Sequence, residues 1–299
     1  MFVAYAMNNN TNEMEYMGTK LELKNGKHLS LTSPLVMGII NITPDSFYDG
    51  GKYISEYDAI ARAEQLVAEG ADIIDLGATS TRPGAVDVSP DKELKRLLPI
   101  LEYLVKNHSN IPVSIDTYHS TVAKETIKKG ASLINDISGG NLDSEMYKTV
   151  GKLKVPYILM HMQGIPQTMQ VEPHYDDVVE EVYIYFCQRI EKLKAAGVEQ
   201  IILDPGFGFG KTVEHNYTLL RHMDRFKNFG MPIMAGLSRK SMINKVLKTK
   251  PENALTGTIA LNTLALLQGA NILRVHDVKE AKQVIEMVKQ YMPHKSPGE

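Results

Sequence analysis

A short pattern of polar and apolar residues occurs four times along the chain. In each copy a helix-like stretch ends at glycine and leads into a compact apolar run that closes on polar residues. The four glycines are Gly70, Gly130, Gly197 and Gly269. Glycine supplies the left-handed position that ends a helix, and a short apolar run is typical of a strand buried on both faces. Helices alternating with such strands predict βα units around a parallel sheet.

Eight strands are predicted in this way, over 35–42, 72–78, 113–117, 133–138, 157–162, 201–206, 232–238 and 272–277. Helical patterns lie between them, over 120–129, 143–151, 176–195, 213–228, 254–268 and 278–291. A further helix begins after Ser55 as its N-cap and presents Ile60, Ala63 and Val67 on one face. Eight strands alternating with helices over roughly 250 residues predict a (β/α)8 TIM barrel. A doubly wound open sheet is the alternative.

The segment before the first of these strands predicts a β-hairpin. Leu21 and Leu23 alternate with polar residues, and Asn25-Gly26 is the dipeptide favoured by a tight type I′ turn. This hairpin is expected to cover the floor of the barrel. Residues 1–18 are expected to form a flexible leader, and 19–299 a single barrel domain, because no change of composition marks a second one.

Composition narrows the class of protein. The chain has 299 residues, 43% of them hydrophobic, and a net charge of −2. This near balance argues against a nucleic-acid-binding or membrane-surface protein, since no large basic field exists to attract phosphate polymers. The longest apolar stretches fall short of a membrane span. A single cysteine, Cys187, excludes a disulfide framework and points to the cytoplasm.

Polar side chains follow the predicted strands in one consistent phase. Residues two apart on a strand share a face, so Ser114 and Asp116 lie together while Val113 and Ile115 point the other way. The same parity holds on five other strands. If these faces point into the barrel, seven polar side chains converge at the carboxyl ends of the strands, where such barrels bind ligands. They are Asn41, Asp116, Asn135, Asp204, Lys240, Arg274 and His276.

The convergent side chains fall into two chemical halves. The acceptors suit the N–H edge of a heterocycle with an amidine-like amino group; they are Asp116, Asn135 and Asp204. The donors suit phosphate oxygens, with arginine as a planar fork and histidine adding charge near neutral pH; they are Asn41, Arg82, Arg274 and His276. A ligand with a heteroaromatic ring and a phosphate group satisfies both halves.

Weaker motifs add little chemistry of their own. The glycine-rich segment 206–212 matches neither a P-loop nor a dinucleotide fingerprint, and is expected to be a flexible loop with Phe207 and Phe209 available to stack on a ring. His161 is expected to be a pocket wall or core residue. No spacing suggests zinc or a nucleophile elbow. A divalent metal is plausible only through a diphosphate substrate, with Asn41 and Asp45 helping to coordinate it.

Seven short motifs then resemble the dihydropteroate synthase family, in the family's order. The first is Met-Gly-Ile-Ile-Asn-Ile-Thr-Pro-Asp-Ser-Phe at 37–47, and the second is Ser-Thr-Arg-Pro-Gly at 80–84. The others lie at 114–117, 134–136, 204–209, 238–241 and 274–276. One departure is Gly77-Ala78-Thr79 before the second motif, where the family commonly has a second glycine and a glutamate.

The resemblance implies a TIM-barrel homodimer that joins p-aminobenzoate to 6-hydroxymethyl-7,8-dihydropterin diphosphate and releases pyrophosphate, with Mg2+ as cofactor. It implies that the pterin is gripped by Asp116, Asn135, Asp204 and Lys240, with Met160 also in contact with substrate. The diphosphate would be held by Asn41, with the metal, and by Thr81, Arg82, Arg274 and His276. For p-aminobenzoate the implied residues are Phe209 and Ser241, and Pro83 is a further implied substrate contact. The implied catalytic residues are Asp45, Asp116, Lys240, Arg274 and His276.

The implied chemistry is a dissociative substitution, in which diphosphate leaves before the aniline nitrogen attacks the methylene carbon. Two other functions compete with it. A related barrel that passes a methyl group from methyltetrahydrofolate to a corrinoid protein would share the pterin grip without needing Arg82, Arg274 and His276. A catalytically silent relative would only bind pterins.

Overall fold

The computed structural model describes residues 20–42, 55–79, 88–165 and 168–292, and its main sheet confirms the predicted barrel. Eight parallel strands follow the order β8-β7-β6-β5-β4-β3-β10-β9. The two ends of this order meet where Leu203 N donates to Pro232 O at 2.8 Å, next to a parallel bridge between Leu203 and Ile233. The strands are β3 (Leu35–Asn41), β4 (Ile73–Gly77), β5 (Val113–Asp116), β6 (Leu133–Asp136), β7 (Tyr157–Met160), β8 (Ile201–Asp204), β9 (Met234–Ala235) and β10 (Ile272–Val275).

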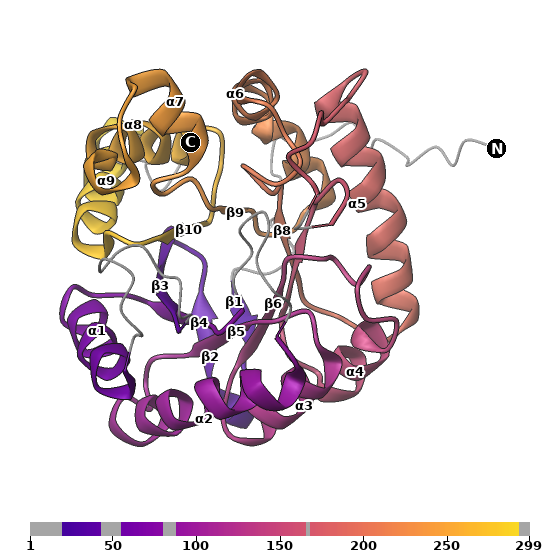
Figure 1. The fold of residues 1–299 in the computed structure, drawn as a ribbon, viewed down its shortest axis with the longest axis vertical. Helices are drawn as coiled ribbons and strands as arrows, with labels where there is room; N and C mark the ends of the chain where they lie inside the picture. Colours follow the sequence, from indigo (N-terminus) through magenta and orange to yellow (C-terminus); the bar gives the residue numbers. More distant parts are fainter. Residues whose placement is uncertain (1–19, 43–54, 80–87, 166–167, 293–299) are drawn as a thin grey trace, which may run out of the picture.

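Helices surround these strands (Figure 1). They are α1 (Glu56–Ala68), α2 (Pro90–Asn107), α3 (Ser120–Lys128), α4 (Met146–Leu153), α5 (Val178–Ala195), α6 (Val213–Arg221), α7 (Ser241–Leu247), α8 (Leu255–Leu267) and α9 (Val278–Tyr291). Helix α2 lies outside the predicted helical ranges; it contains Pro99, a residue that ordinarily interrupts helices. Within the described part of the chain, no helix combines the length and apolarity that a membrane crossing requires.

Helix α1 begins as predicted but buries a different face. Ser55 Oγ accepts from Asp58 N at 3.1 Å, and the Asp58 carboxylate accepts from Ser55 N, which closes a capping box. The buried side chains are Ala59, Ala63 and Leu66. The buried face is therefore rotated by about one residue from the predicted face of Ile60, Ala63 and Val67. Small alanines against the sheet let the helix approach closely, so Leu66 supplies the main apolar contact.

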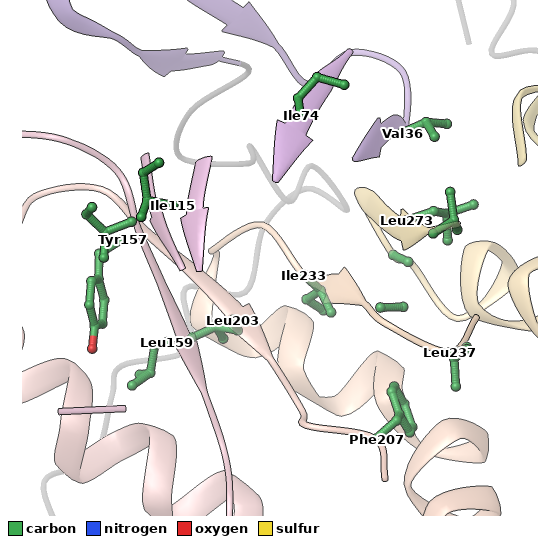
Figure 2. Packing of buried hydrophobic residues seen from close by; sticks show 14 of the residues in the cluster. Val36, Ile74, Ile115, Tyr157, Leu159, Leu203, Phe207, Ile233, Leu237 and Leu273 are labelled. Carbon is green, nitrogen blue, oxygen red and sulfur yellow. The ribbon is translucent and has the colours of Figure 1, made fainter. Parts of the chain in front are cut away.

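Apolar residues form two layers, one on each side of the barrel wall. The outer layer fills the space between strands and helices, and includes Val36, Ile74, Ile115, Leu203 and Leu273 (Figure 2). The inner layer closes the amino-terminal end of the barrel. Its buried members are Leu21, Leu23, Leu35, Met37, Ile73, Leu133, Ile158, Ile202, Met234 and Ile272. The polar site therefore lies on an apolar floor.

The hairpin of β1 (Lys20–Glu22) and β2 (His28–Ser30) contributes to that floor, as predicted. Leu21 and Leu23 are both buried against the inner layer. The predicted two-residue type I′ turn is wrong, because the connection is a 3-10 turn over Lys24–Gly26. Within that turn only Gly26 has a positive φ, of 72°, whereas a type I′ turn needs two such residues. The wider connection lets Leu23 keep its place in the floor while Leu23 N donates to Lys27 O at 2.7 Å.

Candidate active site

The strand phase read from the sequence places polar residues inside the barrel, above the apolar floor. Along β10, Ile272 lies in the inner layer and Leu273 in the outer one, so Arg274 continues the inward face. Ile202 and Leu203 divide in the same way on β8, which turns Asp204 inward. Each of these polar residues stands two positions beyond an apolar floor residue, because strand side chains alternate.

Arg274 is the centre of this polar layer. Its Nε donates to Asp75 Oδ2 and its Nη2 donates to Asp116 Oδ2, both at 2.7 Å. Asn135 Nδ2 donates to the same Asp75 oxygen at 3.1 Å. Four strands thus meet in one hydrogen-bonded network. The guanidinium of Arg274 lies between two carboxylates, so the predicted donor and acceptor halves of the site are in direct contact here. Among the described residues, Arg274 Nη1 has no hydrogen-bond partner, which leaves that nitrogen for a ligand.

Asp75 is a site residue that the sequence reasoning missed. It is fully buried on β4, two positions after the floor residue Ile73. The signal was present, since the parity argument used for Ser114 and Asp116 also selects Asp75. An aspartate in the middle of an apolar run is costly unless it has a partner, and Arg274 provides one.

Three acceptor atoms in this layer are buried without a protein partner in the described part of the chain. They are Asp75 Oδ1, Ser114 Oγ and Asn135 Oδ1. Buried polar groups in folded proteins are ordinarily hydrogen-bonded, because leaving one unpaired costs about 1–3 kcal/mol. A ligand with several N–H donors would satisfy these atoms together.

The carboxylates and lysine of the site have strongly shifted pKa values. Burial raises the pKa of Asp116 to about 7, although the nearby Arg274 charge opposes the shift. Burial also raises the pKa of Asp204, whose Oδ1 accepts from Gly206 N at 2.8 Å. Burial thus disfavours the ionised forms of Asp116 and Asp204, so a ligand that brings or develops positive charge beside them would favour their ionisation and be stabilised in return.

Lys240 faces Asp204 from the segment after β9. Its ammonium donates to Phe207 O and lies 4.7 Å from the centre of the Phe209 ring. Burial lowers the pKa of Lys240 to about 8, while the charge of Asp204 favours the ammonium. At pH 7 the side chain is therefore mainly protonated and can donate hydrogen bonds to a ring carbonyl or ring nitrogen.

This pKa predicts an alkaline limb in the activity. Lys240 is protonated below about pH 8 and loses its charge above it, so kcat/KM for the pterin substrate should fall as pH rises through that value, since kcat/KM reports ionisations of the free enzyme. A pH profile of kcat/KM for Lys240→Arg, which stays protonated, should lack the limb. An identical alkaline limb in both proteins would contradict the assignment.

An apolar wall flanks the polar layer at the mouth of the barrel. Met160 is buried in a cluster with Ile137, Met162 and Met169, and the half-buried Phe209 packs against it. Sulfur-containing and aromatic side chains pack well against a flat ring. The predicted substrate contacts Met160 and Phe209 therefore lie together, and β7, which carries Met160, pairs with β6 and β8, which carry the polar residues Asn135 and Asp204.

The glycine-rich segment differs from its prediction in two ways. Phe207 is fully buried in the outer layer, so it cannot stack on a ligand. The segment is also anchored, because the buried Lys211 ammonium donates to Gly206 O and Phe209 O at 2.9 and 3.1 Å. Lys211 Nζ also lies 2.9 Å from Nδ1 of His161, which is a buried residue as expected. A flexible loop is therefore wrong for this segment.

His276 lies beside Arg274 at the end of β10 and is neutral in this structure. Its Nδ1 is 3.0 Å from Ser238 Oγ, and its backbone N donates to the same oxygen at 3.2 Å. Burial, together with the charge of Arg274, lowers the pKa of His276 to about 3. The expectation that His276 adds positive charge near neutral pH is therefore wrong for this state, and the ring offers a hydrogen bond instead.

The remaining predicted site residues lie at the rim or outside the described chain. Asn41 and Ser241 are exposed, at the end of β3 and the start of α7. A Cβ added to Gly77 would lie 3.4 Å from both Asn41 Oδ1 and Asp116 Cβ, so the amide oxygen is close to the polar layer. The predicted residues outside the described chain are Asp45, Thr81, Arg82 and Pro83. In the segment Gly77-Ala78-Thr79, where the sequence departs from the family pattern, Ala78 is buried and its carbonyl accepts a hydrogen bond from Arg96 Nη1 at 2.8 Å.

The polar layer and the apolar wall at the mouth of this TIM barrel suit a flat heterocycle that forms several hydrogen bonds. Comparison with known proteins identifies the family. The profile of the pterin binding enzyme family matches residues 37–276. The chain is 44% identical to the dihydropteroate synthase of Escherichia coli strain K12 over 265 residues, which cover 88% of this chain and 93% of that protein. The chain belongs to the dihydropteroate synthase family of pterin-binding enzymes.

Solved structures agree with this assignment. The Yersinia pestis dihydropteroate synthase, crystallised with a sulfonamide drug complex, superposes with a TM-score of 0.87 at 41% identity, covering 91% of this chain and 98% of that one. The Xanthomonas albilineans dihydropteroate synthase with 4-aminobenzoic acid gives a TM-score of 0.85 at 40% identity, covering 92% and 99%.

Proposed function

We propose that this chain condenses 6-hydroxymethyl-7,8-dihydropterin diphosphate with p-aminobenzoate, giving 7,8-dihydropteroate and pyrophosphate for folate biosynthesis. The observation that carries the proposal is the network of Asp75, Asp116, Asn135 and Arg274 at the carboxyl ends of four strands. Counting the described residues alone, the network combines buried acceptors that lack a protein partner with a guanidinium whose Nη1 also lacks one. This suits a ligand that is rich in N–H groups at one end and anionic at the other.

The pterin would occupy the polar layer, with its donor edge toward Asp116, Asn135 and Asp204. A carboxylate accepts two parallel N–H bonds from a guanidine-like edge, which gives geometric selectivity as well as affinity. Lys240 would donate to the acceptor side of the ring, and Met160 would pack against its face. These roles are supported by the burial of Asn135 and Asp204 and by the protonation of Lys240 at pH 7.

The diphosphate would lie toward Arg274 and His276, with Thr81 and Arg82 as further predicted contacts. Mg2+ binds through few protein oxygens when substrate phosphates supply the rest. Asn41 is an exposed residue whose amide oxygen lies close to the polar layer, which fits that requirement, and Asp45 is its predicted companion. When bound, Mg2+ would neutralise part of the charge on the leaving group.

The reaction would be a dissociative substitution at the methylene carbon. The bond from this carbon to the diphosphate oxygen breaks and its electron pair leaves with diphosphate, whose charge Arg274 stabilises by an electrostatic contact. The resulting cation is conjugated with the pterin ring, and the Asp116 and Asp204 carboxylates favour its charge. The aniline nitrogen then attacks the carbon and loses a proton. Phe209 and Ser241 would hold p-aminobenzoate for that attack.

A turnover assay with both substrates, with and without Mg2+, tests the proposal. Release of pyrophosphate that depends on p-aminobenzoate, together with formation of dihydropteroate, is the expected result. Methyl transfer from methyltetrahydrofolate to a corrinoid protein, without pyrophosphate release, would favour the competing barrel function. Failure to restore growth of a folate auxotroph lacking the activity would favour a silent pterin binder.

We further propose that two copies of the chain pair through α7 and α8. Helix α8 carries no charged residue, yet Leu264 and Leu267 are exposed on it, as are Val246 and Leu247 on α7. Helices α7 and α8 pack against each other, and exposed apolar residues on neighbouring elements are typical of protein interfaces. The single cysteine supports the further proposal of a cytoplasmic location.

The pairing predicts a specific effect of charge on α8. Leu264→Glu should convert a dimer to a monomer in light scattering after size exclusion, because a carboxylate buried at the centre of an interface loses its hydration. Met287→Glu, at an exposed position on α9, is the matched control and should leave the mass unchanged. A monomeric wild-type chain at micromolar concentration would contradict the proposal.

A further inference from the structure

An ion pair outside the pocket joins the two segments that carry Lys240 and His276. Arg239 directly precedes Lys240, and Asp277 directly follows His276. Arg239 Nε and Nη2 donate to Asp277 Oδ2 and Oδ1 at 2.9 and 2.6 Å. The two side chains are only 9% and 14% exposed. Two parallel hydrogen bonds between a planar guanidinium and a carboxylate restrict sliding as well as rotation, so the pair fixes one segment against the other.

A second link lies one residue away. Ser238 Oγ contacts His276 Nδ1 at 3.0 Å and accepts from His276 N at 3.2 Å. The segment 238–240 is therefore attached to the segment 276–277 at two consecutive positions. On its other side, His276 O accepts a hydrogen bond from Arg62 Nη2 of α1. The imidazole of His276 is thus placed by contacts that involve no substrate.

Arg239 is held in place by more than Asp277. Its Nη1 donates to the carbonyls of Pro251 and Glu252, both at 3.0 Å, in the connection between α7 and α8. Its backbone N donates to Thr258 Oγ1 at 3.0 Å, and its carbonyl accepts from Asn244 Nδ2 at 3.1 Å.

The backbone of Arg239 also has an uncommon conformation. Its φ is 57°, in the left-handed region that residues other than glycine rarely adopt. Such a conformation persists where the surrounding contacts over-determine it, and these positions cluster at functional sites. The left-handed turn directs the next residue, Lys240, back toward Phe207 O and the Phe209 ring.

We propose that Arg239 and Asp277 are positioning residues, which hold Lys240 and His276 at the separation that the pterin diphosphate requires. The inference rests on the proposed function for the roles of Lys240 and His276. The pair itself binds no substrate. It acts by joining the pterin end of the site to the diphosphate end, so its loss weakens the binding of both parts of the substrate at once.

Binding measurements on four proteins test the proposal: wild type, Arg239→Gln, Asp277→Asn and the double variant. Titration calorimetry at 25 °C would give the Kd of inorganic pyrophosphate and of 6-hydroxymethylpterin. We expect each single variant to raise both Kd values by about tenfold. The double variant should differ little from either single one, because both changes remove the same contact. Arg239→Lys should recover part of the loss, since it keeps the charge but not the fork.

Arg225→Gln is the matched control, because it breaks an ion pair with Glu180 at 2.5 Å, on α5, away from the site. Its two Kd values should stay within twofold of wild type. If Arg239→Gln does not fold, Asp277→Asn decides alone, because it leaves the bonds from Arg239 to Pro251 and Glu252 in place.

Two outcomes would overturn the inference: folded variants with a lowered Tm but unchanged Kd values, or additive losses in the double variant. The proposed function fails separately. A wild-type chain that binds both ligands but forms no dihydropteroate would refute the reaction and leave the binding comparison valid. A wild-type chain that binds neither ligand would refute both.

Discussion

Arg274→Ala is expected to lower kcat/KM for the pterin diphosphate by about 10³-fold, because a donor aimed at developing negative charge contributes on that order. The same change should lower the free energy of unfolding by about 3–5 kcal/mol, since removing one partner leaves buried charge uncompensated. In this protein the carboxyl groups left without their partner are Asp75 and Asp116, each 2.7 Å from the guanidinium. Steady-state kinetics and urea unfolding would measure the two effects.

Arg274→Lys separates the two effects. The lysine keeps a positive charge near the carboxylates but cannot donate to Asp75 and Asp116 in a fork while pointing a third nitrogen at the diphosphate. It should restore much of the stability and little of the rate. An Arg274→Ala protein with wild-type turnover would refute the role given to this residue, whatever its stability.

The barrel could be predicted from the sequence because its signals are local and repeated. Each βα unit combines a glycine stop with a short apolar run, and a strand such as β8 is buried on both faces, which leaves little ambiguity. Parity along the strands then fixed which polar residues face inward. The contact between Arg274 and Asp116, which are 158 residues apart, follows from that parity.

Other features depended on three-dimensional context that the sequence does not carry. Phe207 and Phe209 are two apart and chemically alike, yet one is buried in the outer layer and the other faces the mouth. The conformation of the hairpin turn is set by the burial of Leu23 in the floor, which overrides the local preference of Asn25-Gly26 for a type I′ turn. The neutral state of His276 reflects burial beside Arg274, which no short motif encodes.

Asp75→Asn tests the one site residue that the strand parity selects but the motif reading passed over. Both neighbours of Asp75 Oδ2 are donors, namely Arg274 Nε and Asn135 Nδ2. An amide can keep its oxygen at the Oδ2 place and accept from both donors, but its NH2 then replaces Oδ1, the acceptor without a protein partner among the described residues. This NH2 would meet the N–H edge of the pterin and displace the ring. We expect kcat/KM for the pterin diphosphate to fall by about 10²-fold, the scale of small misplacements in a reacting complex.

Combining Asp75→Asn with Arg274→Ala distinguishes a shared network from independent contacts. Asp75→Asn removes one of the two carboxylates that Arg274 neutralises, so Arg274→Ala should cost about 1–2 kcal/mol less stability in the Asp75→Asn background than in wild type. Activity should remain as low as in Arg274→Ala alone. The 2.7 Å contact between Asp75 and Arg274 predicts that their effects on stability are coupled. Additive losses of stability would contradict this and mean that the two residues act separately. Thr126→Ala, on α3 and buried away from the site, is the control, since its loss should add to that of Arg274→Ala.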